Sequence, residues 1–315
     1  MNKVKEFDLP PEDKHRRYFR VAGITVCVES DLDFDTVRFK PEFAPFSVDG
    51  PGSDTVTLRH HFQLPDLDGA ELGEEVYRKA PWAIYRRGAE WLYVGIMPPP
   101  DDTLHRVAVF NAGHTHGTIY SPPREIDWIR DCGWPSLSLF PTDQIWLAPL
   151  LADRDAVLVH SSAVILDGRG LLFVGHSTAG KSTIVTLLKN AAAANAGKPL
   201  DVEILCDDRN VVRRNPDGWQ LHGTWSHGDV ADVSAASAPL RAILFLKQDT
   251  RNEAVRLQDR REIWKRLLAT LIKPMVTAEW WRKELDVLEQ VVKDVPCYTL
   301  HFDKSGAIAE KLIDL

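Results

Sequence analysis

Short segments of alternating apolar and polar residues run through the first half of the chain, a pattern typical of half-buried β-strands. They are rich in β-branched and aromatic residues and lie at residues 18–28, 55–62, 83–96, 104–110 and 118–120. The third segment is expected to be a hairpin that turns at Arg87 and Gly88, and the last two are expected to pair with each other. Between them, the Pro-Pro-Pro-Asp-Asp run at residues 98–102 is typical of a loop. We therefore predict a β-rich N-terminal domain over residues 1–150.

The pattern changes near residue 150, where short apolar strands begin to alternate with segments of helical periodicity. The expected strands are residues 156–165, 171–174, 202–206, 242–246 and 297–301. The expected helices are residues 181–194, 260–272, 279–293 and 306–313. Strands alternating with helices are typical of α/β domains. We predict an α/β domain over residues 151–315, and two domains suit a chain of 315 residues.

Composition narrows the classes of protein that fit. The chain is 44% hydrophobic and 26% charged, with a net charge of −7, so it has no general attraction for nucleic acid or anionic membranes. Its four cysteines are far apart and are interpreted as reduced thiols. The polar N-terminus lacks a hydrophobic signal core, and no apolar run approaches the length of a membrane span. We expect a cytoplasmic protein without nucleic-acid or membrane partners, and the sequence is compatible with a homo-oligomer.

Residues 175–182 read Gly-His-Ser-Thr-Ala-Gly-Lys-Ser, which fits the phosphate-binding pattern G-x-x-x-x-G-K-[ST] without a mismatch. Glycines let the backbone curl so that successive N–H groups converge on phosphate oxygens, and the positive end of the following helix adds to the attraction. Lys181 would supply charge for the β- and γ-phosphates, and Ser182 a hydroxyl for Mg²⁺. The predicted nucleotide-binding residues are Gly175, His176, Ser177, Thr178, Ala179, Gly180, Lys181, Ser182 and Thr183.

The context of this loop supports that interpretation. An apolar strand at residues 171–174 directly precedes it, and an apolar helical face begins at Ile184. Strand, loop and helix in this order are the setting that a P-loop requires. The plainer alternative is a glycine turn that opens an ordinary helix. The combined pattern favours a P-loop that binds ATP with Mg²⁺.

A pair of aspartates is the best candidate for the acidic partner of the P-loop. Asp207 and Asp208 follow the apolar strand at residues 202–206, and α/β sheets place their ligand sites at such strand ends. One carboxylate could hold Mg²⁺ while the other faces an acceptor hydroxyl, and with Ser182 they form the predicted metal site. The alternative is a solvated turn, because Asp-Asp-Arg-Asn is also turn-like by composition.

His160 ends the apolar run at residues 156–159 and is equally compatible with a hydrogen-bonded strand-end histidine or a site residue. His176 is expected on the surface of the loop, because phosphate binding does not need its side chain. His60 and His61 are expected at a strand surface. His114 and His116 are interpreted as turn residues, since no third metal ligand accompanies them.

Taken together, these stretches resemble the catalytic domain of HPr kinase/phosphorylase, which is related in fold to ATP-dependent PEP carboxykinases. The similarity is carried by residues 159–164, by residues 168–183 and by residues 206–208. A segment around Gly223-Thr224-Trp225 is similar to a divergent serine-kinase-like subgroup. The resemblance implies that His160 is the family's upstream histidine and that Asp207, the first aspartate, is the base on the target hydroxyl.

The predicted function is therefore an ATP- and Mg²⁺-dependent kinase, with Asp207, His160 and Lys181 as catalytic residues. Three hypotheses stay open for its partner. The acceptor could be a serine or threonine hydroxyl of a peptide or protein, recognised by the N-terminal half. It could instead be a small molecule such as free serine, which a closed pocket with a carboxylate-binding arginine would favour. The third hypothesis is a nucleotide-dependent binding module with little turnover.

Overall fold

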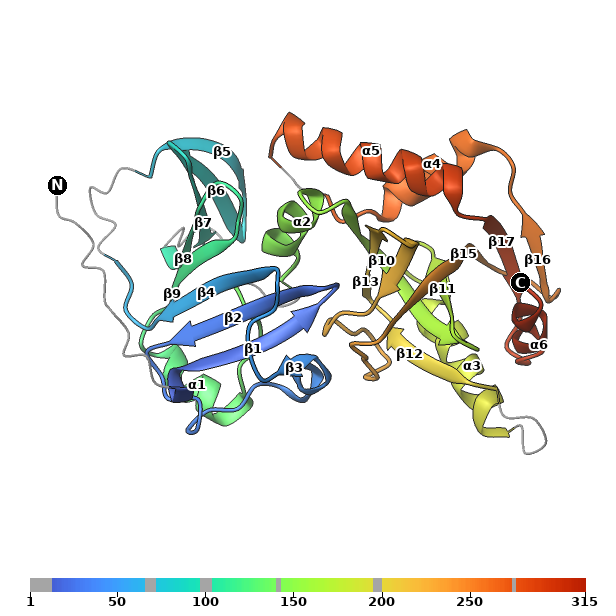
Figure 1. The fold of residues 1–315 in the computed structure, drawn as a ribbon, viewed down its shortest axis with the longest axis horizontal. Coiled ribbons are helices and arrows are strands. Elements are labelled where there is room, and N and C mark those ends of the chain that lie inside the picture. The colour runs from blue at the N-terminus through green and yellow to red at the C-terminus, as the bar shows by residue number, and fades with distance from the viewer. Residues whose placement is uncertain (1–12, 66–71, 97–103, 140–142, 195–199, 274–275) are drawn as a thin grey trace. The chain divides into compact units, whose positions relative to one another are not determined.

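A computed structural model describes residues 13–65, 72–96, 104–139, 143–194, 200–273 and 276–315. The loop expected at residues 98–102 lies outside these ranges. The chain divides into two compact units, Met1–Leu150 and Leu151–Leu315. The fold is mixed α/β, with two large sheets and few helices among the described residues (Figure 1). None of the helices in these ranges combines the length and apolar character needed to cross a membrane.

The first unit is built on one sheet, with nine strands in the described ranges in the order β3-β1-β2-β4-β9-β8-β7-β6-β5. The predicted strand at 18–28 is in fact a hairpin, because Ala22 and Gly23 both take positive φ values (49° and 78°) and turn the chain. The strands are β1 (Arg16–Val21), β2 (Ile24–Ser30), β3 (Ser47–Val48), β4 (Thr55–His61), β5 (Glu74–Lys79), β6 (Trp82–Arg87), β7 (Glu90–Ile96), β8 (Leu104–Phe110) and β9 (His116–Tyr120). The helices that follow are α1 (Glu125–Cys132) and α2 (Gln144–Ala152).

His60 corrects one sequence expectation. It was expected at a strand surface, but side chains of β4 alternate between the two faces of the sheet, and His60 shares the inner face with Val56 and Leu58. Its Nε2 lies 2.9 Å from the carbonyl oxygen of Leu137, and burial lowers its pKa to about 4. It is therefore a neutral core histidine.

The second unit contains an eight-stranded sheet among the described residues. Along its main path the strands run β11-β10-β13-β14-β15-β17-β16, β12 pairs with β10, and β11 also pairs with β15. The strands are β10 (Ala156–Leu166), β11 (Arg169–Val174), β12 (Val202–Cys206), β13 (Arg209–Asn215), β14 (Gly218–His222), β15 (Ser237–Gln248), β16 (Glu253–Arg256) and β17 (Cys297–Phe302). The helices are α3 (Lys181–Ala194), α4 (Arg260–Thr270), α5 (Ala278–Asp294) and α6 (Ile308–Ile313).

Helices cover both faces of this sheet (Figure 1). Residues of α4 and α5, such as Leu267 and Leu288, share one buried cluster with Val174 and Phe245. Residues of α3 and α6, such as Ile184 and Leu312, pack on the opposite face. The segment at residues 175–182 therefore leads from the end of β11, a strand paired on both sides, to the face of the sheet covered by α3.

Strand direction positions the candidate site. Because β10 is antiparallel to both β11 and β12, it separates two strands that run in the same direction. Val174 at the end of β11 pairs with Ser161, and Cys206 at the end of β12 pairs with Ala163. The segments that follow β11 and β12 consequently emerge on either side of the first half of β10.

Candidate functional site

The loop between β11 and α3 has the backbone that its glycines predict. Thr178 and Gly180 take φ values of 72° and 104°, in the region that favours glycine. A Cβ atom on Gly175 would lie 2.5 Å from the Cβ of Ala179, so only glycine fits this close approach. Ala179 donates its amide hydrogen to the carbonyl oxygen of His176 at 3.1 Å, which closes the turn. This curled backbone is the type that presents successive amides to an anion.

Lys181 is the first residue of α3 and is 9% exposed. Its Nζ donates to the carbonyl oxygens of Gly175 and His176 at 3.1 and 3.2 Å. Burial lowers its pKa, and the nearby carboxylates of Asp208 and Asp207 act in the opposite direction. The lysine charge thus faces the inside of the loop, where bound phosphate could replace the two weak carbonyl acceptors.

The remaining residues of the predicted phosphate loop lie at the start of α3 and on the loop surface. Ser182 and Thr183 lie in the first turn of α3, and Ile184 donates its amide to the carbonyl oxygen of Gly180 at 2.9 Å. Within the described residues the Ser182 hydroxyl makes no hydrogen bond. The side chain of His176 is exposed, as expected for the loop surface.

Asp207 is 2% exposed and bound to the backbone. Its Oδ1 accepts the amide hydrogen of Gly228 at 2.5 Å, and its Oδ2 accepts that of Val230 at 2.9 Å. Both carboxylate oxygens therefore hold the segment after β14. This corresponds to the alternative in which an aspartate at this position satisfies backbone amides.

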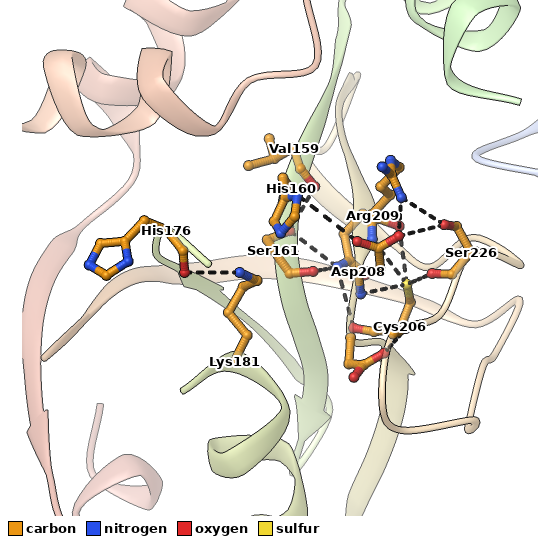
Figure 2. A network of polar contacts seen from close by, with 12 residues as sticks. Val159, His160, Ser161, His176, Lys181, Cys206, Asp208, Arg209 and Ser226 are labelled. Atoms are coloured by element: carbon orange, nitrogen blue, oxygen red, sulfur yellow. Dashed lines mark hydrogen bonds and ion pairs between the residues drawn. The ribbon is translucent and has the colours of Figure 1, made fainter. Parts of the chain in front are cut away.

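Asp208 has a different environment, with polar side chains around it (Figure 2). Its Oδ2 accepts hydrogen bonds from Arg209 and, at 2.8 Å, from the hydroxyl of Ser226. Its Oδ1 lies 4.0 Å from Nδ1 of His160, and the side chain is 17% exposed. Asp208 is thus the carboxylate of the pair that a ligand can approach.

His160 lies near both the aspartates and the loop at residues 175–182. It lies on β10, paired with Arg209 of β13, and Figure 2 shows it between Lys181 and Asp208. Burial, and after it the charge of Lys181, lowers the pKa of His160, whereas Asp208 acts in the opposite direction. The histidine is therefore neutral at neutral pH. The structure brings Lys181, His160 and Asp208 into one electrostatic neighbourhood, although β10 separates the P-loop strand from the strand of the aspartates.

Two site residues had no sequence signal of their own. Arg209 and Ser226 both contact Asp208, and Arg209 also donates to the Ser226 hydroxyl at 3.1 Å. Ser226 lies in the segment around residues 223–228 that also supplies the amide bonded to Asp207. Glycine, threonine and tryptophan in that segment marked it as unusual, but nothing local indicated which aspartate it contacts.

The side chains of the candidate site offer some, but not all, of the ligands that a divalent metal needs. No group of three or more His, Cys, Asp or Glu side chains that could hold a metal occurs in the described ranges. Mg²⁺ in nucleotide sites needs fewer protein ligands, because phosphate oxygens and water complete its shell. Ser182 and Asp208 offer a free hydroxyl and a partly exposed carboxylate for that purpose.

No protein-family model matches this chain, and no curated protein sequence matches it. Among solved structures, the chain is similar to the HPr(Ser) kinase/phosphatase from Coxiella burnetii, with 10% identity and a TM-score of 0.29. That match covers 50% of this chain and 88% of the other. The likeness is too slight to carry an argument about activity.

Proposed function

We propose that the protein is an ATP- and Mg²⁺-dependent kinase that transfers the γ-phosphate to a hydroxyl group, with a serine or threonine of a peptide or protein as the acceptor. One observation carries this proposal. The glycine-rich loop after β11 brings Lys181 to the same part of one sheet as His160 on β10 and Asp208 after β12, and the charges of Lys181 and Asp208 both act on the pKa of His160.

The residues of the chain would act mainly by positioning and charge. The loop amides and Lys181 hold the phosphates. The acceptor oxygen forms a bond to the γ-phosphorus while the bond from that phosphorus to the bridging oxygen breaks, and ADP leaves. Mg²⁺, held by the Ser182 hydroxyl with phosphate oxygens and water completing its shell, would neutralise phosphate charge. The hydroxyl proton passes to a carboxylate.

In this proposal the carboxylate of Asp208 accepts the proton. The resemblance to HPr kinases favours Asp207 for that role instead. Both oxygens of Asp207 accept backbone amides, so a substrate hydroxyl would have to displace a hydrogen bond to reach it. Within the part of the chain that the structure describes, Oδ1 of Asp208 accepts no hydrogen bond, and Nδ1 of His160 lies 4.0 Å from it. His160, whose Nδ1 lies 4.0 Å from this oxygen, would help to orient the carboxylate.

The small-molecule alternative also has support. A groove beside the P-loop contains Arg266, the kind of residue that binds a carboxylate. The two acceptor classes therefore call for the same assay with different acceptors.

The test uses γ-labelled ATP with Mg²⁺, and either free L-serine or a library of serine- and threonine-containing peptides as acceptors. Asp208→Asn should lose label transfer by roughly 10²–10⁴-fold, the range for a general base, while ATP affinity changes little. Asp207→Asn should mainly lower stability. The opposite ranking would return the role of base to Asp207. ATP binding without transfer to any acceptor would contradict the kinase and leave a nucleotide-dependent binding module.

A further inference from the structure

A groove lies on the face of the second unit's sheet that α4 covers. Its volume is about 520 Å³, within the range of small-molecule sites. It begins at Gly175 and His176, the first two residues of the P-loop, and continues over the ends of the parallel strands β15 and β17. Ligand sites of α/β sheets lie at such strand ends. The groove is distinct from the site of His160 and Asp208.

The polar side chains of the groove share one property: none of them is acidic. Lys247 and Arg266 are cationic, His176 and His301 are histidines, and Thr299 and Thr270 carry hydroxyls, while the rest of the lining is apolar or glycine. This holds in a protein whose net charge is −7. The carboxylates of Glu262 and Asp249 pair with Arg266 and His301 but do not themselves line the groove, so the lining favours a negatively charged occupant.

The contacts of Arg266 fix its guanidinium in an orientation that suits the binding of an anion. Its guanidinium lies 5.5 Å from the ring centroid of Phe245, its Nε donates to Glu262 at 2.7 Å, and its Nη1 donates to the Thr299 hydroxyl at 3.3 Å. Within the described residues its Nη2 has no hydrogen-bond partner. A guanidinium fixed by stacking and by two bonds loses little freedom when it binds a carboxylate or phosphate.

Two further groups complete the polar lining of the groove. Lys247 is exposed and forms no ion pair with any residue that the structure describes. His301 is 7% exposed, and its Nδ1 lies 2.8 Å from Oδ2 of Asp249, which is also paired with Arg251. Asp249 thereby fixes the imidazole and leaves Nε2 as its remaining polar atom.

We propose that this groove is a second binding site, which takes a small anionic molecule bearing a carboxylate or phosphate group, bound by Arg266, Lys247 and His301. The site does not depend on phosphoryl transfer at the P-loop. Its occupant could be the acceptor of the transfer or a separate effector, and both have the same chemistry.

Inorganic phosphate is a suitable probe, because binding to the folded state raises the unfolding temperature. Both the groove and the P-loop could take phosphate, so two variants separate them. Lys181→Ala leaves Arg266, Lys247 and His301 in place, and Lys181 itself does not line the groove, so phosphate should still stabilise this variant. In Arg266→Gln, saturated with Mg²⁺ and a non-hydrolysable ATP analogue, phosphate affinity should fall by about tenfold or more relative to wild type under the same conditions.

Arg256→Gln is the matched control. Arg256 also stacks on an aromatic ring, 5.2 Å from the Tyr298 centroid, but it does not line the groove. Its phosphate affinity should match that of wild type. Stabilisation that is lost in Lys181→Ala, and lost in wild type once the ATP analogue saturates the P-loop, would place phosphate at the P-loop alone and overturn the proposal.

Glycerate, which carries both a hydroxyl and a carboxylate, tests whether the occupant of the groove is the phosphate acceptor or a separate effector. Glycerate that competes with phosphate and becomes labelled from γ-labelled ATP would identify the groove as an acceptor site. Competition without labelling would identify it as an effector site. Failure of both glycerate and phosphate to bind at the groove would contradict the proposed site.

Discussion

Adjacent aspartates at the end of β12 meet different partners, and the partners decide what each can do. Asp207 accepts the amides of Gly228 and Val230, whereas Asp208 contacts Arg209 and Ser226. The sequence showed that the pair follows a buried strand. It could not separate their roles, because most of these partners come from a segment some twenty residues further along the chain, whose path depends on tertiary packing.

Glu284 on α5 should lower the free energy of unfolding, because its carboxyl group is buried. It is fully buried, neither carboxylate oxygen has a hydrogen-bond partner among the described residues, and burial raises its pKa from 4.5 to about 9. Because the pKa is higher in the folded state, the pH-dependent part of this cost is absent below pH 4.5. Its cost grows as the pH rises from there towards 9, since only the unfolded chain ionises.

Glu284→Gln should therefore stabilise the protein by about 5 kcal/mol at pH 8 and change its stability little at pH 4.5. Denaturant unfolding at both pH values measures this difference. The exposed Glu289 on the same helix supplies the control, Glu289→Gln, for which no such pH dependence is expected. An equal effect of Glu284→Gln at the two pH values would show that the carboxyl is not buried as described.

At the scale of elements, the sequence predicted those helices and strands whose formation depends on nearby residues. The strand, loop and helix around the P-loop have the predicted order, and the helix spans 181–194 as expected. Strands β13 and β14 were missed. In β13, arginine and asparagine at residues 209–210 and 213–215 interrupt the apolar alternation, and pairing with β10 and β14 supplies the stabilisation that its composition does not.

A substitution at Gly180 tests whether ATP binding depends on the backbone conformation of the loop at residues 175–182. A side chain there would meet a φ of 104° and place Cβ 2.7 Å from the Phe302 ring. Gly180→Ala should lower the free energy of unfolding by about 1–3 kcal/mol and abolish measurable ATP binding. Gly168→Ala is the control, because its φ is 75° but nothing lies within 4 Å of the added Cβ. Gly168→Ala should show only the backbone strain and should keep ATP affinity.

At the scale of the molecule, the order of elements was predictable and their pairing was not. The switch from strands to alternating strands and helices is visible in the sequence. That β10 lies between β11 and β12, and so brings His160 between Lys181 and Asp208, depends on long-range pairing that no local pattern encodes. Acceptor recognition by residues 1–150 stays a prediction, as does the part each aspartate plays.

Calorimetry of Mg²⁺·ATP binding to wild type and Lys181→Ala tests most directly whether this site binds nucleotide phosphates. Lys189→Ala is the control, since Lys189 lies on the same helix and pairs with Asp232 at the surface. Loss of charge-assisted hydrogen bonds to two phosphates should weaken ATP binding by about tenfold to several hundredfold in Lys181→Ala, with Lys189→Ala unchanged. Equal ATP affinity in wild type and Lys181→Ala would contradict the assignment of a P-loop and, with it, the proposed kinase.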